Sequence, residues 1–269
     1  MAVVVAAVAT TKSLSEPLNE IAARDLALEL AACPKGALSF DGDGTLWSGD
    51  VGEDFFYGIL DSGELSEVAA DGIMGAAAEA GVTLGAGAVL TARNIYDAYL
   101  AGRFDEERVC EIMTWINAGW TTTRTTAFVT SVISEKFASR IHPEVRLVID
   151  EARRAGHEIF VVSASPRPIV EAAAAIVGIP TTHVLAATAV LEGDRFAARV
   201  HRPIPYGAGK ASALRTKLGA VPLLAAFGDN AFDAEMLAMS ARPIAVRPKA
   251  RLLNLAPEIR GIRQLVPVE

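Results

Sequence analysis

Three short apolar runs, far apart in the chain, each stop abruptly at a polar residue. The runs are residues 37–40, 159–162 and 223–227, and the polar residues that follow are Asp41, Ser163 and, after one glycine, Asp229. Apolar runs of this length that alternate with helical patterns predict a parallel sheet covered by helices on both faces. Ligands of such sheets bind beyond the carboxyl ends of the strands. We therefore predict an α/β fold with a Rossmann-like parallel sheet, and a site where these three side chains meet.

The stretch from residue 52 to residue 138 has a different character. Glycine and alanine are frequent, strand signals are absent, and helical patterns dominate, including one after an expected Asp105 cap. The polar run 121–126 is typical of a turn. We predict an inserted helical cap domain at 52–138, and a core domain formed by 1–51 and 139–269.

Other patterns predict the remaining elements. An amphipathic helix is expected at 17–32, with Pro17 in its first turn, and a hairpin at 186–200 that turns at Gly193-Asp194. Further helices are predicted at 143–155, 168–177, 208–218 and 233–239, and a last short strand at 244–246.

Charge and composition restrict the partners. The net charge of −7 argues against nucleic acid, because binding to its backbone needs a basic face. An acidic protein that binds an anionic small molecule must concentrate positive charge locally, so we expect a metal ion, a lysine and backbone N–H groups. No run of 18 apolar residues occurs, so no transmembrane helix is expected. Two cysteines give no disulfide framework, and no basic residue precedes the apolar residues 1–9, so we predict a cytoplasmic protein without a secretory signal.

Four motifs occur in a fixed order. They are Asp41-Gly42-Asp43-Gly44-Thr45, then Ser163 at a strand end, then Gly209-Lys210-Ala211, then Gly228-Asp229-Asn230-Ala231-Phe232-Asp233. In this order the chain resembles the haloacid dehalogenase superfamily, in its phosphatase branch, and most closely the phosphoserine-phosphatase-like group. The resemblance covers about residues 38–246, and the helical stretch lies where this group carries its cap.

The resemblance implies a role for each acidic residue. Asp41 would be the nucleophile that forms an aspartyl phosphate, and Asp43 would act first as the acid and then as the base. Mg²⁺ would be held by Asp41, the backbone carbonyl of Asp43 and Asp229, with Asp233 supporting that shell.

The resemblance also implies how phosphate would be bound. Lys210, Ser163 and the N–H of Ala164 would hold the phosphoryl oxygens, and Thr45 belongs to the same phosphate-binding set. Phe232 stands where the group often has Asn, and Asn230 is the candidate to take over that polar contact. Gly44 and the pair Ala164-Ser165 also depart from the phosphoserine phosphatases, which usually carry Ser and two glycines there. These departures weaken phosphoserine as the substrate.

The substrate-facing residues are less defined. Asp50 lies where the phosphoserine enzymes carry a Glu that reads the substrate ammonium, and a solvated loop acid is an equal alternative. Glu53 and Asp54 extend an acidic patch that favours an amine-bearing phosphate. Candidates for a substrate carboxylate or for stacking on a cation are Arg93, Arg103, Arg124, Trp115 and Trp120, although surface solvation and core packing are the more common roles.

The prediction is therefore a magnesium-dependent phosphomonoester hydrolase that acts on a small phosphorylated metabolite, with phosphoserine among the amine-bearing candidates. Two alternatives stay open: a phosphotransferase or mutase that uses the same acyl phosphate, and a catalytically silent binding module on this fold. A 2-haloacid dehalogenase is disfavoured, because that chemistry does not need the acid/base that Asp43 supplies.

Overall fold

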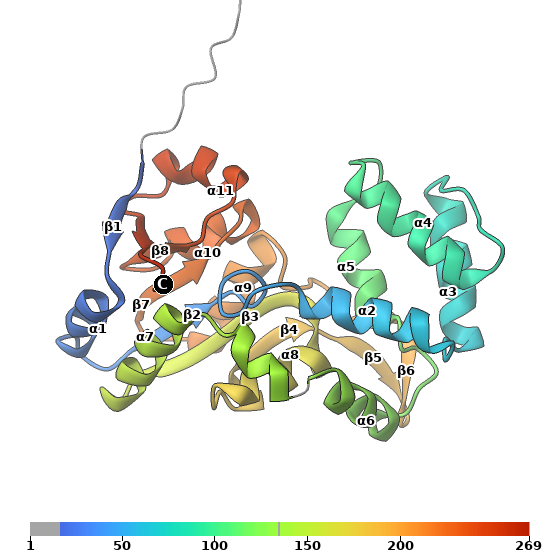
Figure 1. Ribbon diagram of the computed structural model, residues 1–269, viewed down its shortest axis with the longest axis horizontal. Coiled ribbons are helices and arrows are strands. Elements are labelled where there is room, and N and C mark those ends of the chain that lie inside the picture. Colours follow the sequence, from blue (N-terminus) through green and yellow to red (C-terminus); the bar gives the residue numbers. More distant parts are fainter. Residues whose placement is uncertain (1–16, 134, 269) are drawn as a thin grey trace, which may run out of the picture.

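The molecule is built on one seven-stranded sheet (Figure 1). The computed structural model describes residues 17–133 and 135–268, so the apolar residues 1–9 lie outside the described residues. All neighbouring strands pair in parallel, in the order β1-β9-β8-β7-β2-β3-β4, which confirms the predicted Rossmann-like α/β fold. The strands are β1 Asn19–Ile21, β2 Ala37–Phe40, β3 Glu158–Pro166, β4 Val184–Ala187, β7 Leu223–Gly228, β8 Pro243–Val246 and β9 Arg263–Leu265.

The strand order reverses at β2. From β2 the chain adds β3 and β4 on one side, and it later adds β7, β8 and β9 on the other. A ligand site in an open parallel sheet lies at such a reversal point, outside the carboxyl ends of the strands. Because β2 is followed directly by Asp41, the fold itself places that residue at the expected position.

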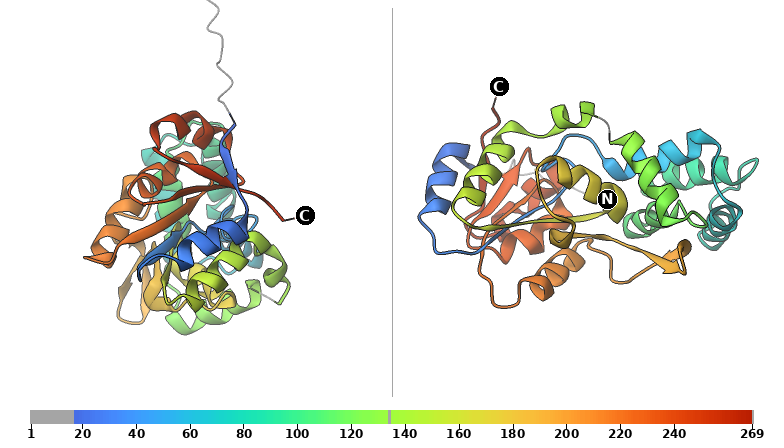
Figure 2. Two further views of the ribbon diagram at one scale, coloured as in Figure 1. Left: turned by 90° about the vertical axis from the view of Figure 1, so that its left-hand side faces the viewer. Right: turned by 90° about the horizontal axis from the view of Figure 1, so that it is seen from below.

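Helices cover both faces of the sheet, as the two views of Figure 2 show. Leu38 and Phe40 of β2 point into a core shared with α1 Ala23–Ala31, α7 Pro143–Arg154 and α8 Arg167–Ile176. Ala37, on the opposite face, packs in a second core with α9 Ala208–Leu218, α10 Ala234–Ala238 and α11 Ala250–Leu255. In residues 17–133 and 135–268, no helix has the length and apolar character that a membrane crossing requires.

Of the helices that lie between β2 and β3 in the chain, the first five form a group at one end of the molecule (Figures 1 and 2). We call residues 51–132 the helical insertion; it consists of α2 Val51–Ser62, α3 Glu67–Glu79, α4 Ala88–Leu100, α5 Glu106–Trp115 and α6 Thr122–Val132. Asp105 caps α5 as predicted, by accepting a hydrogen bond from the N–H of Arg108 at 2.8 Å. The prediction of a turn at 121–126 is wrong, because Thr121 caps α6 and Thr125 and Val129 bury one face of that helix.

A hairpin reaches from the core to the helical insertion. Its strands, β5 Ala189–Glu192 and β6 Arg195–Val200, are antiparallel and turn at Gly193-Asp194 as predicted. The N–H of Gly119 donates to the carbonyl of Phe196 at 2.7 Å, and the N–H of Phe196 donates to the carbonyl of Trp120 at 3.0 Å. The hairpin prediction began too early, since the residues of β4 belong to the main sheet.

The two chain segments that connect the helical insertion to the sheet lie side by side. The N–H of Ser48 donates to the carbonyl of Arg140 at 2.9 Å, and the N–H of His142 donates to the carbonyl of Leu46 at 3.2 Å. The Arg140 guanidinium donates to the Ser48 carbonyl at 2.7 Å and pairs with Asp54 of α2 at 2.5 Å. Arg140 therefore fixes the start of α2 against the segment through which the chain returns to the sheet.

The prediction of one helix at 17–32 is partly wrong. Asn19–Ile21 forms the edge strand β1, which pairs with β9, and the helix starts only at Ala23. Ile21 and the later Leu26 and Leu30 are all buried, but they contact the core from two different elements. A single helix and a short strand followed by a helix can both give this spacing of apolar residues. Local periodicity alone therefore does not distinguish one structure from the other.

Packing of α1 against the sheet gives a stability prediction. Leu30 is fully buried, whereas Leu28 on the same helix is 70% exposed. We expect Leu30→Ala to lower the free energy of unfolding by about 2–5 kcal/mol, because it removes buried methyl groups and leaves a cavity. The matched change Leu28→Ala should stay within about 0.5 kcal/mol. Urea unfolding followed by circular dichroism measures both, and equal losses would show that α1 does not pack as described.

Candidate active site

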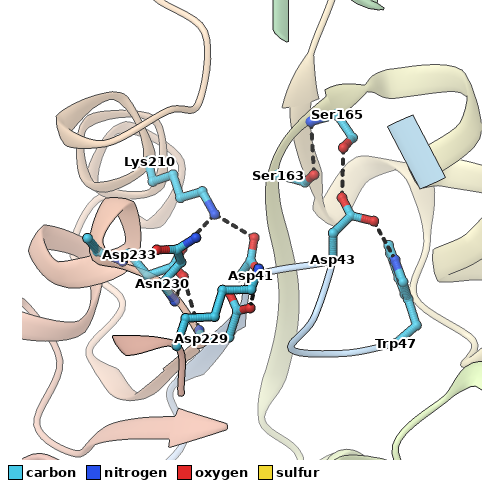
Figure 3. Close-up of polar contacts among 11 residues, drawn as sticks. Asp41, Asp43, Trp47, Ser163, Ser165, Lys210, Asp229, Asn230 and Asp233 are labelled. Carbon is cyan, nitrogen blue, oxygen red and sulfur yellow. Dashed lines mark hydrogen bonds and ion pairs between the residues drawn. The ribbon is translucent and has the colours of Figure 1, made fainter. Parts of the chain in front are cut away.

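The carboxyl ends of β2, β3 and β7 meet around one cavity of about 420 Å³. The residues that line it come from the loop after β2, the last part of β3, the segment before α9 and its first turn, the loops after β7 and β8, and the helical insertion. Figure 3 shows the polar contacts at its base. Of the predicted site residues, those that line the cavity are Asp41, Asp43, Asp50, Ser163, Ala164, Lys210 and Asn230.

Lys210 bridges two carboxylates of the site (Figure 3). Its Nζ donates to Oδ1 of Asp41 at 2.5 Å and to Oδ1 of Asp233 at 2.6 Å, and all three side chains are buried. Burial alone would lower the pKa of Lys210, but the carboxylates of Asp233 and Asp41 raise it overall. Lys210 therefore stays an ammonium group, and it links the nucleophile candidate after β2 to the loop after β7.

Three carboxylates form a cluster that suits a divalent cation. One oxygen each from Asp41, Asp229 and Asp233 lies within 4.8 Å of the others. Burial and the neighbouring Asp233 carboxylate raise the pKa of Asp41 well above its usual range. Burial also raises the pKa of Asp229 to about 6, although the Lys249 ammonium opposes the shift. A bound divalent cation would remove the cost of keeping both groups ionised.

The free oxygens of this cluster identify the residues that fit a metal. Oδ2 of Asp41 and Oδ1 of Asp229 are buried and accept no hydrogen bond from any residue in the described ranges. Asp233 has no such oxygen, because its Oδ1 binds Lys210 and its Oδ2 accepts from the N–H groups of Asp229 and Asn230 at 3.1 and 3.0 Å. Hard cations such as Mg²⁺ bind carboxylate oxygens. Asp41 and Asp229 therefore fit as ligands, and Asp233 positions the loop that carries Asp229.

Lys249 is a site residue that the motif analysis missed. It follows β8, its Nζ lies 2.9 Å from Oδ2 of Asp229, and it lines the cavity. The rule that polar residues cluster after parallel strands applies to it as well, since β8 ends only three residues earlier. That signal was present in the sequence, but a lysine after a strand is usually solvated.

Asp43 is held by three donors from different segments (Figure 3). Its Oδ1 accepts from the indole N–H of Trp47 and from the backbone N–H of Val51, both at 2.7 Å. Its Oδ2 accepts from the hydroxyl of Ser165 at 2.7 Å. Trp47 and Ser165 were not predicted as site residues. Trp47 is fully buried, so the loop that carries Asp43 is anchored in the core.

The predicted phosphate-binding residues occupy different positions. Ser163 is buried at the end of β3, where its hydroxyl accepts from the N–H of Ser165 at 3.0 Å. Ala164 lines the cavity beside it. Thr45 is fully buried, and its hydroxyl has no hydrogen-bond partner within the described residues. Asn230 lines the cavity and caps the following turn by accepting from the N–H of Ala231 at 2.7 Å.

The acidic patch at the start of α2 divides into two parts. Asp50 and Glu53 line the cavity, but Asp54 pairs with Arg140 at the chain connections. Asp50 also caps α2, because its Oδ1 accepts from the N–H of Glu53 at 2.9 Å. Asp50 therefore has two roles, because it caps α2 and also lines the cavity, and it is not a solvated loop acid.

The cationic and aromatic candidates of the helical insertion have structural contacts. Arg93 pairs with Asp61 and Arg124 pairs with Glu64, and Arg103 is exposed. Trp115 and Trp120 are buried in the core of the insertion, and the Trp120 ring is covered by the Arg124 guanidinium at 4.0 Å. None of the five lines the cavity. Packing, the more common role, accounts for both tryptophans.

Comparison with known proteins identifies the family. The family model of haloacid dehalogenase-like hydrolases matches residues 38–238. This match covers most of the chain and includes all four motifs, so the protein belongs to the haloacid dehalogenase-like hydrolases.

Individual relatives are more distant. The chain is 27% identical over 174 residues to the inhibition of morphological differentiation protein of Streptomyces azureus, a match that spans 61% of each protein. A protein of unknown function from Bordetella pertussis Tohama I shares the fold with a TM-score of 0.70 at 18% identity, over 87% of this chain and 99% of that one. A phosphoserine phosphatase solved as a phospho-aspartyl intermediate analogue has a TM-score of 0.52 at 18% identity, over 87% and 95% of the two chains.

Gly44 gives a test of the carboxylate cluster. Its φ is +84°, and a Cβ at this position would lie 2.3 Å from Oδ2 of Asp229. We expect Gly44→Ala to displace Asp229 and weaken Mg²⁺ binding by at least about tenfold, because one carboxylate ligand moves. Calorimetric titration of the folded protein with Mg²⁺ measures this. Gly63→Ala is the control, since Gly63 also has a positive φ, +72°, but lies in the helical insertion, where an added Cβ would have no atom within 4 Å. Equal Mg²⁺ affinity in both variants would contradict the assignment.

Proposed function

We propose that this protein is a magnesium-dependent phosphomonoester hydrolase that works through an aspartyl phosphate on Asp41 and acts on a small phosphorylated metabolite. The observation that carries the proposal is the free Oδ2 of Asp41. It is a buried carboxylate oxygen without a partner in the described residues, on a side chain that lines the cavity beside Lys210. The net charge of −7 fits a diffusible small molecule rather than nucleic acid, and we place the protein in the cytoplasm.

Asp41 and Asp229 would hold Mg²⁺ through their free oxygens, with the backbone carbonyl of Asp43 as a third ligand. When bound, the ion would offset the repulsion between a phosphate dianion and the carboxylates. Lys210 and Lys249 supply the fixed positive charge on the same side of the cavity. Ser163 and the N–H of Ala164 would orient the phosphoryl oxygens from the last part of β3.

In the first step, a carboxylate oxygen of Asp41 attacks phosphorus, and the bond between phosphorus and the leaving oxygen breaks. Asp43 donates a proton to the leaving oxygen, so that a neutral alcohol departs. In the second step, Asp43 takes a proton from water, which attacks the phosphorus of the acyl phosphate. Inorganic phosphate is released, and Asp41 is restored.

The contacts of Asp43 indicate which oxygen carries the proton. The N–H groups of Trp47 and Val51 can only donate, and both point at Oδ1. The hydroxyl of Ser165 at Oδ2 can donate to the carboxylate or accept from the carboxylic acid. Oδ2 is therefore the oxygen that can gain and lose a proton without losing its hydrogen bond.

The family and the fold support this chemistry. Haloacid dehalogenase-like hydrolases are the matched family, and the phosphoserine phosphatase solved as a phospho-aspartyl intermediate analogue shares the fold. The defining experiment is Mg²⁺-dependent release of inorganic phosphate from a generic aryl phosphate by the purified full chain. Phosphoryl transfer to a sugar without phosphate release would indicate the mutase alternative, and inertness of the folded protein would indicate a binding module.

The nucleophile is tested by Asp41→Asn. The amide cannot form the acyl phosphate, so we expect kcat to fall by about three orders of magnitude or more while the fold is kept. Removal of Mg²⁺ with a chelator should abolish activity, and Mg²⁺ should restore it. Phosphate release is the readout, with circular dichroism as the check on folding. Substantial metal-dependent turnover by Asp41→Asn would refute the mechanism.

The acid/base assignment is tested by Ser165→Ala. Loss of one hydrogen bond to a charged group costs about 1.5–3 kcal/mol, so we expect kcat to fall by roughly tenfold or more. Ser131→Ala, at an exposed serine of the helical insertion, is the control. An unchanged kcat in Ser165→Ala would argue against proton transfer through Oδ2 of Asp43.

A further inference from the structure

The cavity extends well beyond the carboxylate cluster. Its far part is formed by Asp50, by residues from the helical insertion and by two aromatic residues from the core. The side chains of this far part are Asp50, Glu53, Tyr99, Glu106, Tyr206 and Phe232. A smaller pocket of about 50 Å³ adjoins it behind Asp50 and Glu53. In a phosphomonoester hydrolase, this part of the cavity receives the leaving group.

The charge of the cavity is strongly unbalanced. Five carboxylates and two ammonium groups line it. Both ammonium groups, on Lys210 and Lys249, are paired with carboxylates of the cluster. With Asp229 and Asp233 included, seven carboxylates stand against these two lysines and Arg251, which pairs with Glu106. Even with one divalent cation the site would stay negative, and a phosphate dianion adds further negative charge. A cationic group on the substrate would restore the balance.

No arginine lines the cavity in the part of the chain that the structure describes. The guanidinium of Arg251 is engaged by a carboxylate of the cavity wall, since it pairs with Glu106 at 2.9 Å. Three arginines of the helical insertion have carboxylate partners elsewhere, since Arg93, Arg108 and Arg124 pair with Asp61, Glu79 and Glu64, and its fourth, Arg103, is exposed and does not line the cavity. Among the described residues, the leaving-group part therefore offers no cationic side chain that would pair with a carboxylate.

Two carboxylates of this part are free to bind a cation. Glu53 accepts from the Tyr96 hydroxyl, and Asp50 accepts from the backbone N–H of Glu53. Neither forms an ion pair with any residue in 17–133 or 135–268. Burial and the nearby Asp43 carboxylate raise the pKa of Asp50 well above its usual range. A cationic group of the substrate beside Asp50 would lower the free-energy cost of keeping this carboxylate ionised.

Aromatic faces complete the surroundings. Tyr206 and Phe232 lie with their ring centroids 5.3 Å apart, and Tyr99 of α4 lines the same cavity. Aromatic faces attract ammonium groups, including fully alkylated ones that cannot donate hydrogen bonds. Carboxylates and rings in one part of the cavity therefore suit both primary and quaternary ammonium groups.

We propose that the substrate is the phosphate monoester of a small ammonium alcohol that carries no carboxylate, and that Glu53, with the rings of Tyr99, Tyr206 and Phe232, determines this specificity. The proposal rests on the proposed phosphatase function and deepens it. Within the amine-bearing phosphates it excludes phosphoserine, because the serine carboxylate would face Asp50 and Glu53 with no cation to bind it. The products are the ammonium alcohol and inorganic phosphate.

The test compares four monoesters with the full chain and Mg²⁺. Phosphocholine and phosphoethanolamine carry a cation, 3,3-dimethylbutyl phosphate is the neutral isostere of phosphocholine, and phosphoserine adds a carboxylate. We expect kcat/KM for at least one cationic ester to exceed that for the neutral isostere and for phosphoserine by about tenfold or more. Equal values, or a preference for phosphoserine or for the neutral ester, would overturn the proposal.

Variants assign the preference to named residues. Glu53→Gln keeps an acceptor for the Tyr96 hydroxyl but removes the charge, so the ratio of kcat/KM for cationic over neutral ester should fall by about tenfold. Glu107→Gln makes the same change at an exposed neighbour of the cavity wall, and it should leave the ratio unchanged. An unchanged ratio in Glu53→Gln would remove Glu53 from the proposal.

Failure of this inference is distinguishable from failure of the proposed function. Hydrolysis of an aryl phosphate without any preference for cationic esters contradicts only the inference. If no ester is hydrolysed, the proposed function fails, and calorimetric binding to the Asp41→Asn variant still decides the inference. Phosphocholine or phosphoethanolamine should then bind more tightly than 3,3-dimethylbutyl phosphate, and equal binding would overturn it.

Discussion

The ion-paired Lys210 is the interaction on which the arrangement of this site depends. Burying an ammonium group and two carboxylates away from water costs several kcal/mol per ion, and their mutual attraction offsets that cost only when the geometry is good. Here one Nζ contacts Asp41 and Asp233 at 2.5 and 2.6 Å. Such a triad adds little net stability compared with apolar residues of the same size. Its consequence is positional, because it fixes the end of β2 against the loop after β7.

That positioning explains why each carboxylate of the cluster has a different role. Lys210 and two backbone N–H groups use both oxygens of Asp233, so this residue holds the loop in place. Asp41 and Asp229 each bind one lysine and keep one free oxygen. Three carboxylates with two ammonium groups leave one negative charge without compensation. Asp41 and Asp229 would hold a divalent cation through their free oxygens, and such a cation would supply the missing positive charge.

The sequence was most informative where a buried strand stops at a polar residue. β2 was predicted with its observed bounds, and the residues after β2, β3 and β7 do converge on one cavity, because strand ends of a parallel sheet share one edge. Edge strands were harder to predict. β1 was absorbed into a helix and β4 into a hairpin, since three or four residues carry too little periodicity to separate these structures.

Side-chain partners within the site were not predictable, for a different reason. Trp47 and Ser165 hold Asp43, and Lys249 holds Asp229, through contacts that arise only when separate loops meet. The role of Asp50 was not predictable for the same reason. It caps a helix and lines the cavity at the same time, and the sequence does not show that one side chain does both. Motif spacing identifies the residues that can react. Which groups orient them, and which face the leaving group, follows from the packing of the helical insertion against the core.

Phe232 belongs both to a motif and to the wall of the cavity. It stands in the fourth motif where a polar residue is common in the phosphoserine-phosphatase-like group, so the sequence suggested a missing phosphate contact. In the structure its ring lies 5.2 Å from Nζ of Lys210 and packs beside Tyr206. It shields the buried ammonium from water, which strengthens the ion pairs with Asp41 and Asp233. Phe232 also lines the leaving-group part of the cavity. An amide at this position would favour a polar, carboxylate-bearing substrate, whereas an aromatic ring favours a cation. Two features therefore agree with each other: Phe232 departs from the motif, and no arginine among the described residues lines the cavity. Both features affect which substrate binds, and neither removes a group that the phosphate chemistry needs.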